Sequence, residues 1–272
     1  EVRTGFLNHL PVSLKKFLPV LRFFYFNNLD LSDYDLVISS SGAEAKGVKT
    51  GKNTIHICYM HAPTHYYWSR YNQYLKHPGM GKLDPLARFG LKTLVSPLRK
   101  WDKAFSKRPD FIIANSTHTQ SEIMKYYNRE SFVIFPPVEL ARFKNTYTKK
   151  SGFVVTGRQT PYKKIDLAVK ASKELNERLI VIGNGPDHQK LLEIADGNKN
   201  ITFVTNASDK EVADYLKKAK GFIFAGIDDF GIAPVEALAS GTPVIAFNKG
   251  GALDYIKNKE NGILFNKQNV KT

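Results

Sequence analysis

The sequence has a single cysteine, Cys58, and no run of 18 or more apolar residues among its 272. One cysteine cannot form an internal disulfide, which excludes a disulfide-stapled secreted domain and makes a reducing cytoplasm the expected compartment. The short apolar runs predict no membrane-spanning helix. Hydrophobic residues still make up 42% of the chain, and its length exceeds that of a usual single domain. We therefore expect a soluble protein with more than one core.

Acidic residues are also scarce, with 25 Asp and Glu against 40 Lys and Arg and a net charge of +15. Residues 1–150 carry 23 cations against 11 acids, whereas residues 151–272 carry 17 against 14. Aromatic side chains accompany the cations at 14–26 and 66–108. This combination suits the inner face of an anionic plasma membrane, and nucleic acid would use the same chemistry. For any single residue, a packed aromatic or a solvated cation is the simpler interpretation.

Short apolar runs alternate with helical periods along the chain, which indicates βαβ units and an α/β fold with parallel sheets. The polar stretch 142–151 has no apolar periodicity, so we place one domain at residues 1–148 and a second at 149–272. The expected strands are residues 35–39, 54–59, 110–114, 131–135, 152–156, 178–182, 201–205, 220–225, 243–247 and 262–265. The expected helices are residues 67–75, 86–107, 119–126, 164–176, 187–195, 209–219, 231–240 and 251–258.

Two carboxylates, Asp228 and Glu236, follow the expected strand 220–225. Asp228 would lie in the loop at the carboxyl end of that strand, and Glu236 about one turn inside the next helix. Carboxylates accept hydrogen bonds from sugar and ribose hydroxyls, and a helix N-terminus receives phosphate. The pair therefore suits a nucleotide sugar. The alternative is that Asp228 and Asp229 are ordinary acids before a helix.

Two cations, Arg158 and Lys163, follow the expected strand 152–156 and would stand at the same sheet edge. Fixed cations there can hold a diphosphate and stabilise its charge as it leaves. On so basic a chain, two solvated cations are the alternative.

The motifs together resemble glycosyltransferase family 4, retaining enzymes of the GT-B architecture with two Rossmann-like domains that face a cleft. The resemblance rests on Gly-Arg-x4-Lys at 157–163, Gly-Asn-Gly-Pro at 183–186, Asp-x7-Glu at 228–236 and Ala-Leu-Ala-Ser-Gly-Thr-Pro at 237–243. It continues through Cys-Tyr-Met-His-Ala-Pro at 58–63, Ile-Ala-Asn-Ser at 113–116 and Pro-Pro-Val at 136–138. The set is most similar to bacterial mannosyltransferase-type members that build surface polysaccharides.

The resemblance implies transfer of a hexose, such as mannose from GDP-mannose, to a glycan or lipid-linked acceptor. It implies no cofactor and no metal ion, because the two cations would serve the leaving group. Asp228 stands where the family usually has Glu. The opening strands of the first domain and a C-terminal helix of the second are expected to be missing. The implied catalytic residues are His61, Arg158, Lys163 and Asp228, and the implied donor-binding residues are Arg158, Lys163, Gly185, Asp228, Phe230, Gly231, Ile232 and Glu236.

His61 follows the expected strand 54–59, which places it at a carboxyl end, and the family resemblance puts it near the transferred sugar. A structural histidine is the alternative, as we expect for His56 and His65. Two other functions remain open. A dinucleotide-dependent oxidoreductase needs Gly-x-Gly-x-x-Gly, and position 188 is His. A non-catalytic basic module that binds membrane or nucleic acid would explain the charge but not the carboxylates.

Overall fold

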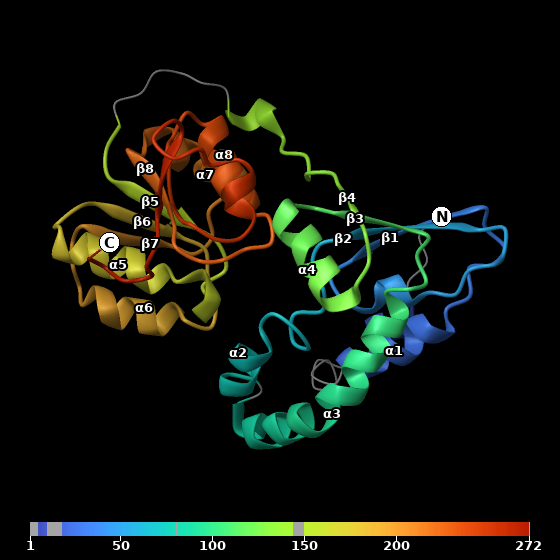
Figure 1. Cartoon of the computed structure of the whole chain (residues 1–272). Coiled ribbons are helices and arrows are strands. Elements are labelled where there is room, and N and C mark those ends of the chain that lie inside the picture. The colour runs from blue at the N-terminus through green and yellow to red at the C-terminus, as the bar shows by residue number, and fades with distance from the viewer. Residues whose placement is uncertain (1–4, 10–17, 80, 144–149, 272) are drawn as a thin grey trace. The chain divides into compact units, whose positions relative to one another are not determined.

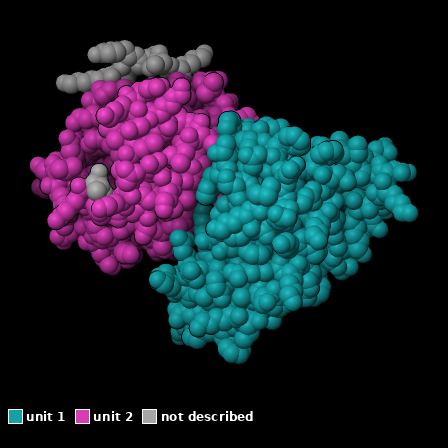
Figure 2. Space-filling view, viewed as in Figure 1, with its two compact units in different colours: residues 1–135 teal, residues 136–272 magenta. Residues whose placement is uncertain are grey.

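The structure is a computed structural model that describes residues 5–9, 18–79, 81–143 and 150–271. It divides into two compact units, Glu1–Phe135 (unit 1) and Pro136–Thr272 (unit 2), which Figure 2 shows in teal and magenta. Both units are built on parallel β-sheets, as the alternating pattern predicted. No helix among the described residues is long and apolar enough to cross a bilayer.

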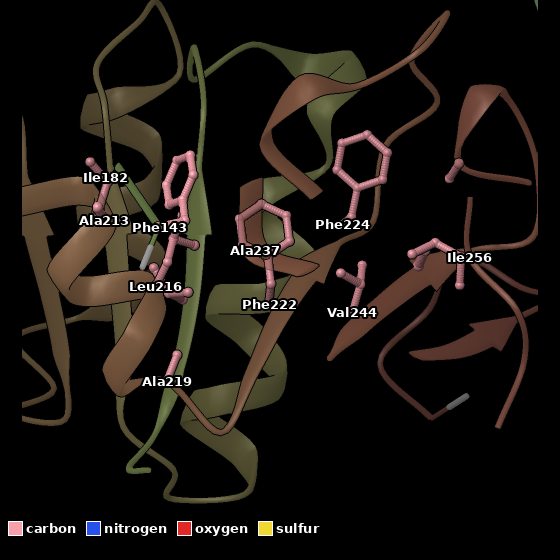
Figure 3. Packing of buried hydrophobic residues seen from close by; sticks show 13 residues of the cluster. Phe143, Ile182, Ala213, Leu216, Ala219, Phe222, Phe224, Ala237, Val244 and Ile256 are labelled. Atoms are coloured by element: carbon pink, nitrogen blue, oxygen red, sulfur yellow. The ribbon is translucent and has the colours of Figure 1, made fainter. Parts of the chain in front are cut away.

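The unit boundary lies earlier than the expected boundary after residue 148 because the first residues of the expected join belong to the core of unit 2. Phe143 is buried in that core among side chains of the second sheet and its helices (Figure 3). Val138 packs against the same core. Residues 144–149 of the expected join lie outside the described residues.

Unit 1 contains a four-stranded parallel sheet in the order β1-β2-β3-β4. Its strands are β1 Leu36–Ser41, β2 Ile55–Met60, β3 Phe111–Ala114 and β4 Phe132–Val133, and its α-helices are α1 Leu18–Asn28, α2 Tyr71–Lys76, α3 Asp84–Phe105 and α4 Thr117–Tyr127. Cys58, Met60 and Ile112 point to one face and pack against Ile123 and Tyr127 of α4. The alternate residues of the same strands are largely exposed, since no described helix covers the other face.

Two details show how the sequence sets these elements. Ser116 caps α4, because its side chain accepts a hydrogen bond from the Thr119 amide, and Asn128 ends the helix in the left-handed region. Helix α1 was not expected, because Arg22 and the aromatic residues around it suited a membrane-facing run. Residues 14–17 of that run lie outside the described residues.

Unit 2 is a three-layer sandwich around a six-stranded parallel sheet in the order β10-β9-β8-β5-β6-β7. Helices α5 and α6 pack on one face, and α7 and α8 pack on the other (Figure 1). The strands are β5 Phe153–Thr156, β6 Leu179–Ile182, β7 Ile201–Val204, β8 Gly221–Phe224, β9 Val244–Phe247 and β10 Gly262–Phe265. The helices are α5 Ile165–Glu174, α6 His188–Ala195, α7 Asp209–Lys218 and α8 Ile232–Ala239.

The expected helix over 251–258 is wrong. Only a 3-10 turn, Gly251–Asp254, forms there. Gly250 has φ +84° and the Gly251 amide donates to the Asp228 carbonyl, so the segment follows the loop after β8 instead of winding into a helix.

Candidate functional site

Loops at the carboxyl edge of the unit 2 sheet pack backbone against backbone, and glycines make this possible. A Cβ on Gly185 would lie 2.4 Å from the Gln159 carbonyl oxygen, and a Cβ on Gly226 would lie 2.7 Å from the Tyr162 carbonyl oxygen. The loops after β5, β6 and β8 therefore meet at one edge, where ligands of open α/β sheets bind. Gly185 was predicted as a donor-binding residue, and in the structure its missing side chain lets two loops come into contact.

Gln159 fastens the loop after β5 to the loop after β6. Its buried side chain donates to the Gly183 carbonyl at 2.6 Å and lies 2.7 Å from Nδ1 of His188. Its backbone amide donates to the Asn184 carbonyl at 2.9 Å. The neighbouring Arg158 is thereby held on a rigid turn. Gln159 could not be predicted from the sequence, because a buried Gln in a loop follows no apolar period.

Lys163 and Asp228, predicted separately for the diphosphate and the sugar, form an ion pair with each other. Both side chains are largely buried, with 21% of Lys163 and 12% of Asp228 exposed. The contact connects the loop after β5 to the loop after β8, in agreement with the predicted shared edge. A cation and an anion held together at a sheet edge can each bind part of a ligand once the ligand enters between them.

Arg158 is exposed, and its guanidinium makes no hydrogen bond or ion pair with the residues that the structure describes. Its fixed charge of +1 is therefore open to an anion. Arg158 is therefore an accessible cation at this edge.

The turn before α8 is shaped by Gly231 and Tyr255. Gly231 caps the helix with φ +85°, a conformation that favours glycine. The Tyr255 hydroxyl lies 2.7 Å from the Phe230 carbonyl oxygen and 2.9 Å from that of Gly231, and burial raises the pKa of Tyr255, so the hydroxyl stays protonated and donates. Phe230 is buried, whereas Ile232 is exposed at the first turn. The first-turn amides of α8 have no partner within their own helix and can bind an anion.

Glu236 lies on α8 and pairs with Arg142, whose guanidinium approaches Oε1 of the carboxylate at 2.7 Å. Burial raises the pKa of Glu236, the Arg142 charge opposes the rise, and Asp209 adds to it. Arg142 was assigned to a polar join and was missed as part of this edge. The adjacent Phe143 was the available signal, because an aromatic residue beside the cation indicates a packed segment.

His61 follows β2 in unit 1, as predicted. Its ring is exposed, Nε2 lies 2.7 Å from the Ser40 hydroxyl, and Tyr59 packs edge-on against it at 5.3 Å. Its backbone amide donates to the Ser41 carbonyl at the end of β1. The ring is thus oriented and open to solvent. By contrast, His56 is fully buried against Ser39, as expected for a structural histidine.

Just beyond His61 lies a buried charge network that the sequence did not reveal. Lys46 and Asp102 form an ion pair at 2.6 Å with 1% and 3% of their side chains exposed. Asp102 also accepts hydrogen bonds from Thr64 at 2.7 Å, Tyr127 at 2.7 Å and Trp68 at 2.6 Å. These contacts fasten the segment after His61 to α3 and α4.

Residues 138–272 match the family model described as glycosyl transferases group 1. Unit 2 of this chain therefore has the sequence of that glycosyltransferase family. Relatives of the chain include the O-antigen chain mannosyltransferase RfbU of Salmonella typhimurium, 30% identical over 51% of this chain and 42% of that protein. Another is the alpha-1,3/1,6-mannosyltransferase ALG2 of Mus musculus, 25% identical over 57% of this chain and 46% of that protein. The chain thus matches less than half the length of these two relatives.

Solved structures confirm the GT-B fold. Sucrose-phosphate synthase from Thermosynechococcus elongatus covers 100% of this chain with a TM-score of 0.69 at 18% identity, and this chain covers 70% of it. Anabaena HepE in complex with UDP covers 95% of this chain with a TM-score of 0.62 at 15% identity, and this chain covers 71% of it.

Proposed function

We propose that the protein transfers a hexose from a nucleoside diphosphate sugar to a hydroxyl of a glycan or lipid-linked acceptor. The observation that supports this most strongly is the arrangement at one edge of unit 2 of an open cation, Arg158, beside the ion pair of Lys163 and Asp228. The mannosyltransferases among the relatives favour mannose as the transferred sugar, and a further relative from Mus musculus is named for GDP-Man, whereas HepE was solved with UDP.

In the proposed reaction, the bond between the anomeric carbon and the diphosphate oxygen breaks, and the diphosphate leaves with the electron pair. The acceptor oxygen forms the new bond to the same carbon, and its proton passes to the leaving phosphate. Arg158, Lys163 and the first-turn amides of α8 stabilise the charge on the diphosphate. Retention of anomeric configuration, independence from metal ions and contact of His61 with the sugar are the parts of the proposal that follow from the family resemblance.

Titration with GDP-mannose, UDP-glucose and NAD at two salt concentrations tests this function. We expect saturable binding of one nucleotide sugar that persists at the higher salt, because a built site is less screened than a basic surface. Preferential binding of NAD would favour an oxidoreductase. Binding of all three that disappears with salt would favour a non-catalytic basic module.

Substitutions of Glu236 and Asp228 should affect ligand binding differently. Glu236→Gln is expected to weaken both the plain nucleotide and the nucleotide sugar, because the proposal places Glu236 on the ribose. Asp228→Asn should spare the plain nucleotide, because the change also frees Lys163 for the diphosphate, and should weaken only the nucleotide sugar. Calorimetric titration of both variants decides this, and loss of plain-nucleotide binding in Asp228→Asn would count against the assignment of Asp228.

Helix α3 provides the surface for the proposed membrane contact. Of the aromatic residues predicted to face a membrane, Tyr67 is buried and the Tyr66 hydroxyl donates a hydrogen bond to Glu44. Phe89, by contrast, is 65% exposed. Leu83 and Leu86 are exposed beside it. The exposed cations along α3 and just before it are Lys82, Arg88, Lys92, Lys100 and Lys103. Apolar side chains flanked by cations suit an anionic bilayer, where each basic residue contributes about 1 kcal/mol.

The double change Leu86→Ser and Phe89→Ser should reduce flotation with anionic vesicles, whereas Leu175→Ser, at an exposed leucine of unit 2, should not. Binding should rise with anionic lipid, fall with salt and survive competing duplex DNA. Equal binding to neutral and anionic vesicles, binding to neither, or displacement by the duplex would instead leave the positive charge as a solvated face.

A further inference from the structure

Arg142 has no role in the proposed reaction, yet it makes the most direct contact with Glu236. It lies in the 3-10 turn Leu140–Phe143 before β5. Its guanidinium is 2.7 Å from Oε1 of Glu236 on α8, 2.7 Å from Oδ2 of Asp209 at the start of α7, and 3.8 Å from Glu139. Of the three carboxylates, only Glu236 is largely buried, with 15% of its side chain exposed against 83% and 71% for the other two.

The guanidinium is held from more than one side. The Arg142 guanidinium carbon lies 5.2 Å from the ring centre of Phe143, and Phe143 is buried in the core of unit 2. The planar guanidinium spans Asp209 and Glu236, which belong to two different helices. Arg142 is therefore fixed in position relative to α8 before any ligand enters.

This contact uses only one of the two carboxylate oxygens of Glu236. Arg142 takes Oε1, whereas Oε2 makes no hydrogen bond with any residue in the described part of the chain. An ionised carboxylate can accept several hydrogen bonds, so Oε2 keeps its acceptor capacity. The Arg142 charge also counteracts the effect of burial, which would otherwise favour the protonated form that cannot accept at both oxygens.

We propose that Arg142 is a positioning residue that holds the Glu236 carboxylate by Oε1 and leaves Oε2 to accept from a ribose hydroxyl of the donor. The inference rests on the proposed function, since it assigns the ribose subsite of the same site. A purely structural Arg142, which only ties the turn before β5 to α7 and α8, is the competing account. The two accounts differ in one expected result. Only a positioning role makes the loss of Arg142 weaken the contribution of the ribose hydroxyls to nucleotide binding selectively.

The experiment compares a nucleoside diphosphate with its 2′,3′-dideoxy counterpart, using GDP and UDP. The wild-type chain should bind the better of the two nucleotides about tenfold more tightly than the dideoxy form, because the hydroxyls donate to a charged acceptor. Arg142→Gln and Glu236→Gln should each reduce this ratio to about threefold or less, and the double variant should show no further reduction. Arg142→Lys should restore part of the ratio, because Lys supplies one charged donor.

Asp209→Asn is the matched control, because it removes an exposed partner of Arg142 and should keep the wild-type ratio. Thermal melting of every variant shows whether a change in the binding ratio comes from loss of the folded state. A wild-type ratio in Arg142→Gln, with or without a lower melting temperature, would overturn the positioning role. Equal binding of both ligands by the wild-type chain would overturn it while the proposed function stands. Failure of the wild-type chain to bind either nucleotide would overturn both.

Discussion

Replacing Lys163 by Ala is expected to weaken GDP or UDP binding by about 1 to 3 kcal/mol, the range for a charged hydrogen bond, and to leave nucleoside binding nearly unchanged. The loss should exceed that of Arg158→Ala. Removing Lys163 also leaves Asp228 unpaired and largely buried beside the diphosphate. Removing the exposed Arg158 uncovers no such charge.

A second substitution separates the loss of the Lys163 contact from the effect of the unpaired Asp228 carboxylate. In the double variant Lys163→Ala with Asp228→Asn, part of the lost affinity should return, because the unpaired carboxylate is gone. Lys170→Ala is the matched control and should change binding by less than about 0.5 kcal/mol, since Lys170 pairs with Asp166 one turn earlier in α5 and with no other acid among the described residues. Calorimetric titration gives all four values. Equal loss for nucleoside and nucleotide in Lys163→Ala would refute the diphosphate assignment.

Replacing Asp102 by Ala is expected to lower the free energy of unfolding by about 3 to 5 kcal/mol, because it leaves the Lys46 charge buried without its partner. The change also removes the acceptor that Thr64, Tyr127 and Trp68 share. The segment after His61 should loosen together with α3 and α4.

Asp196→Asn provides the comparison for this second effect, because Asn tolerates the left-handed backbone at this position, φ +53°, while it removes the charge. Asp196 pairs with Lys173 at 3.1 Å, but 78% of its side chain is exposed, so the expected change is below about 1 kcal/mol. Urea unfolding of both variants, followed by far-UV circular dichroism, reports on both units, and tryptophan fluorescence adds the transition of unit 1 through Trp68 and Trp101. Similar stabilities for the two variants would show that the Lys46 and Asp102 pair contributes no more than a surface ion pair.

The fold was predictable because its strands are short apolar runs. All ten expected strands exist, and α5, α6 and α7 lie within a few residues of the expected positions. Helix α1 was missed because its aromatic residues and Arg22 resembled part of a membrane-facing run. The expected helix over 251–258 does not form, although the sequence has a helical period there, because Gly250 and Gly251 pack closely on the loop after β8.

Within the candidate site, the sequence predicted residue types at strand ends better than it predicted partners. Lys163 and Asp228 could be placed at one edge from strand order alone, but their ion pair depends on how Gly226 lets two loops meet. The roles of Gln159 and Arg142 depend on contacts between distant segments. No periodicity in one sequence encodes such contacts.

Hydrogen–deuterium exchange of the whole chain, with and without the nucleotide sugar that binds, tests most directly where the donor site lies. The account predicts slower exchange in the loops at 157–164, 183–187 and 226–232, where Gly185, Gly226 and Gly231 let the chain pack around the site. It predicts little change in the helices α5 and α6 that cover one face of the same sheet. Protection confined to the basic segments of unit 1, or no protection in these three loops at saturating ligand, would contradict the proposed donor site.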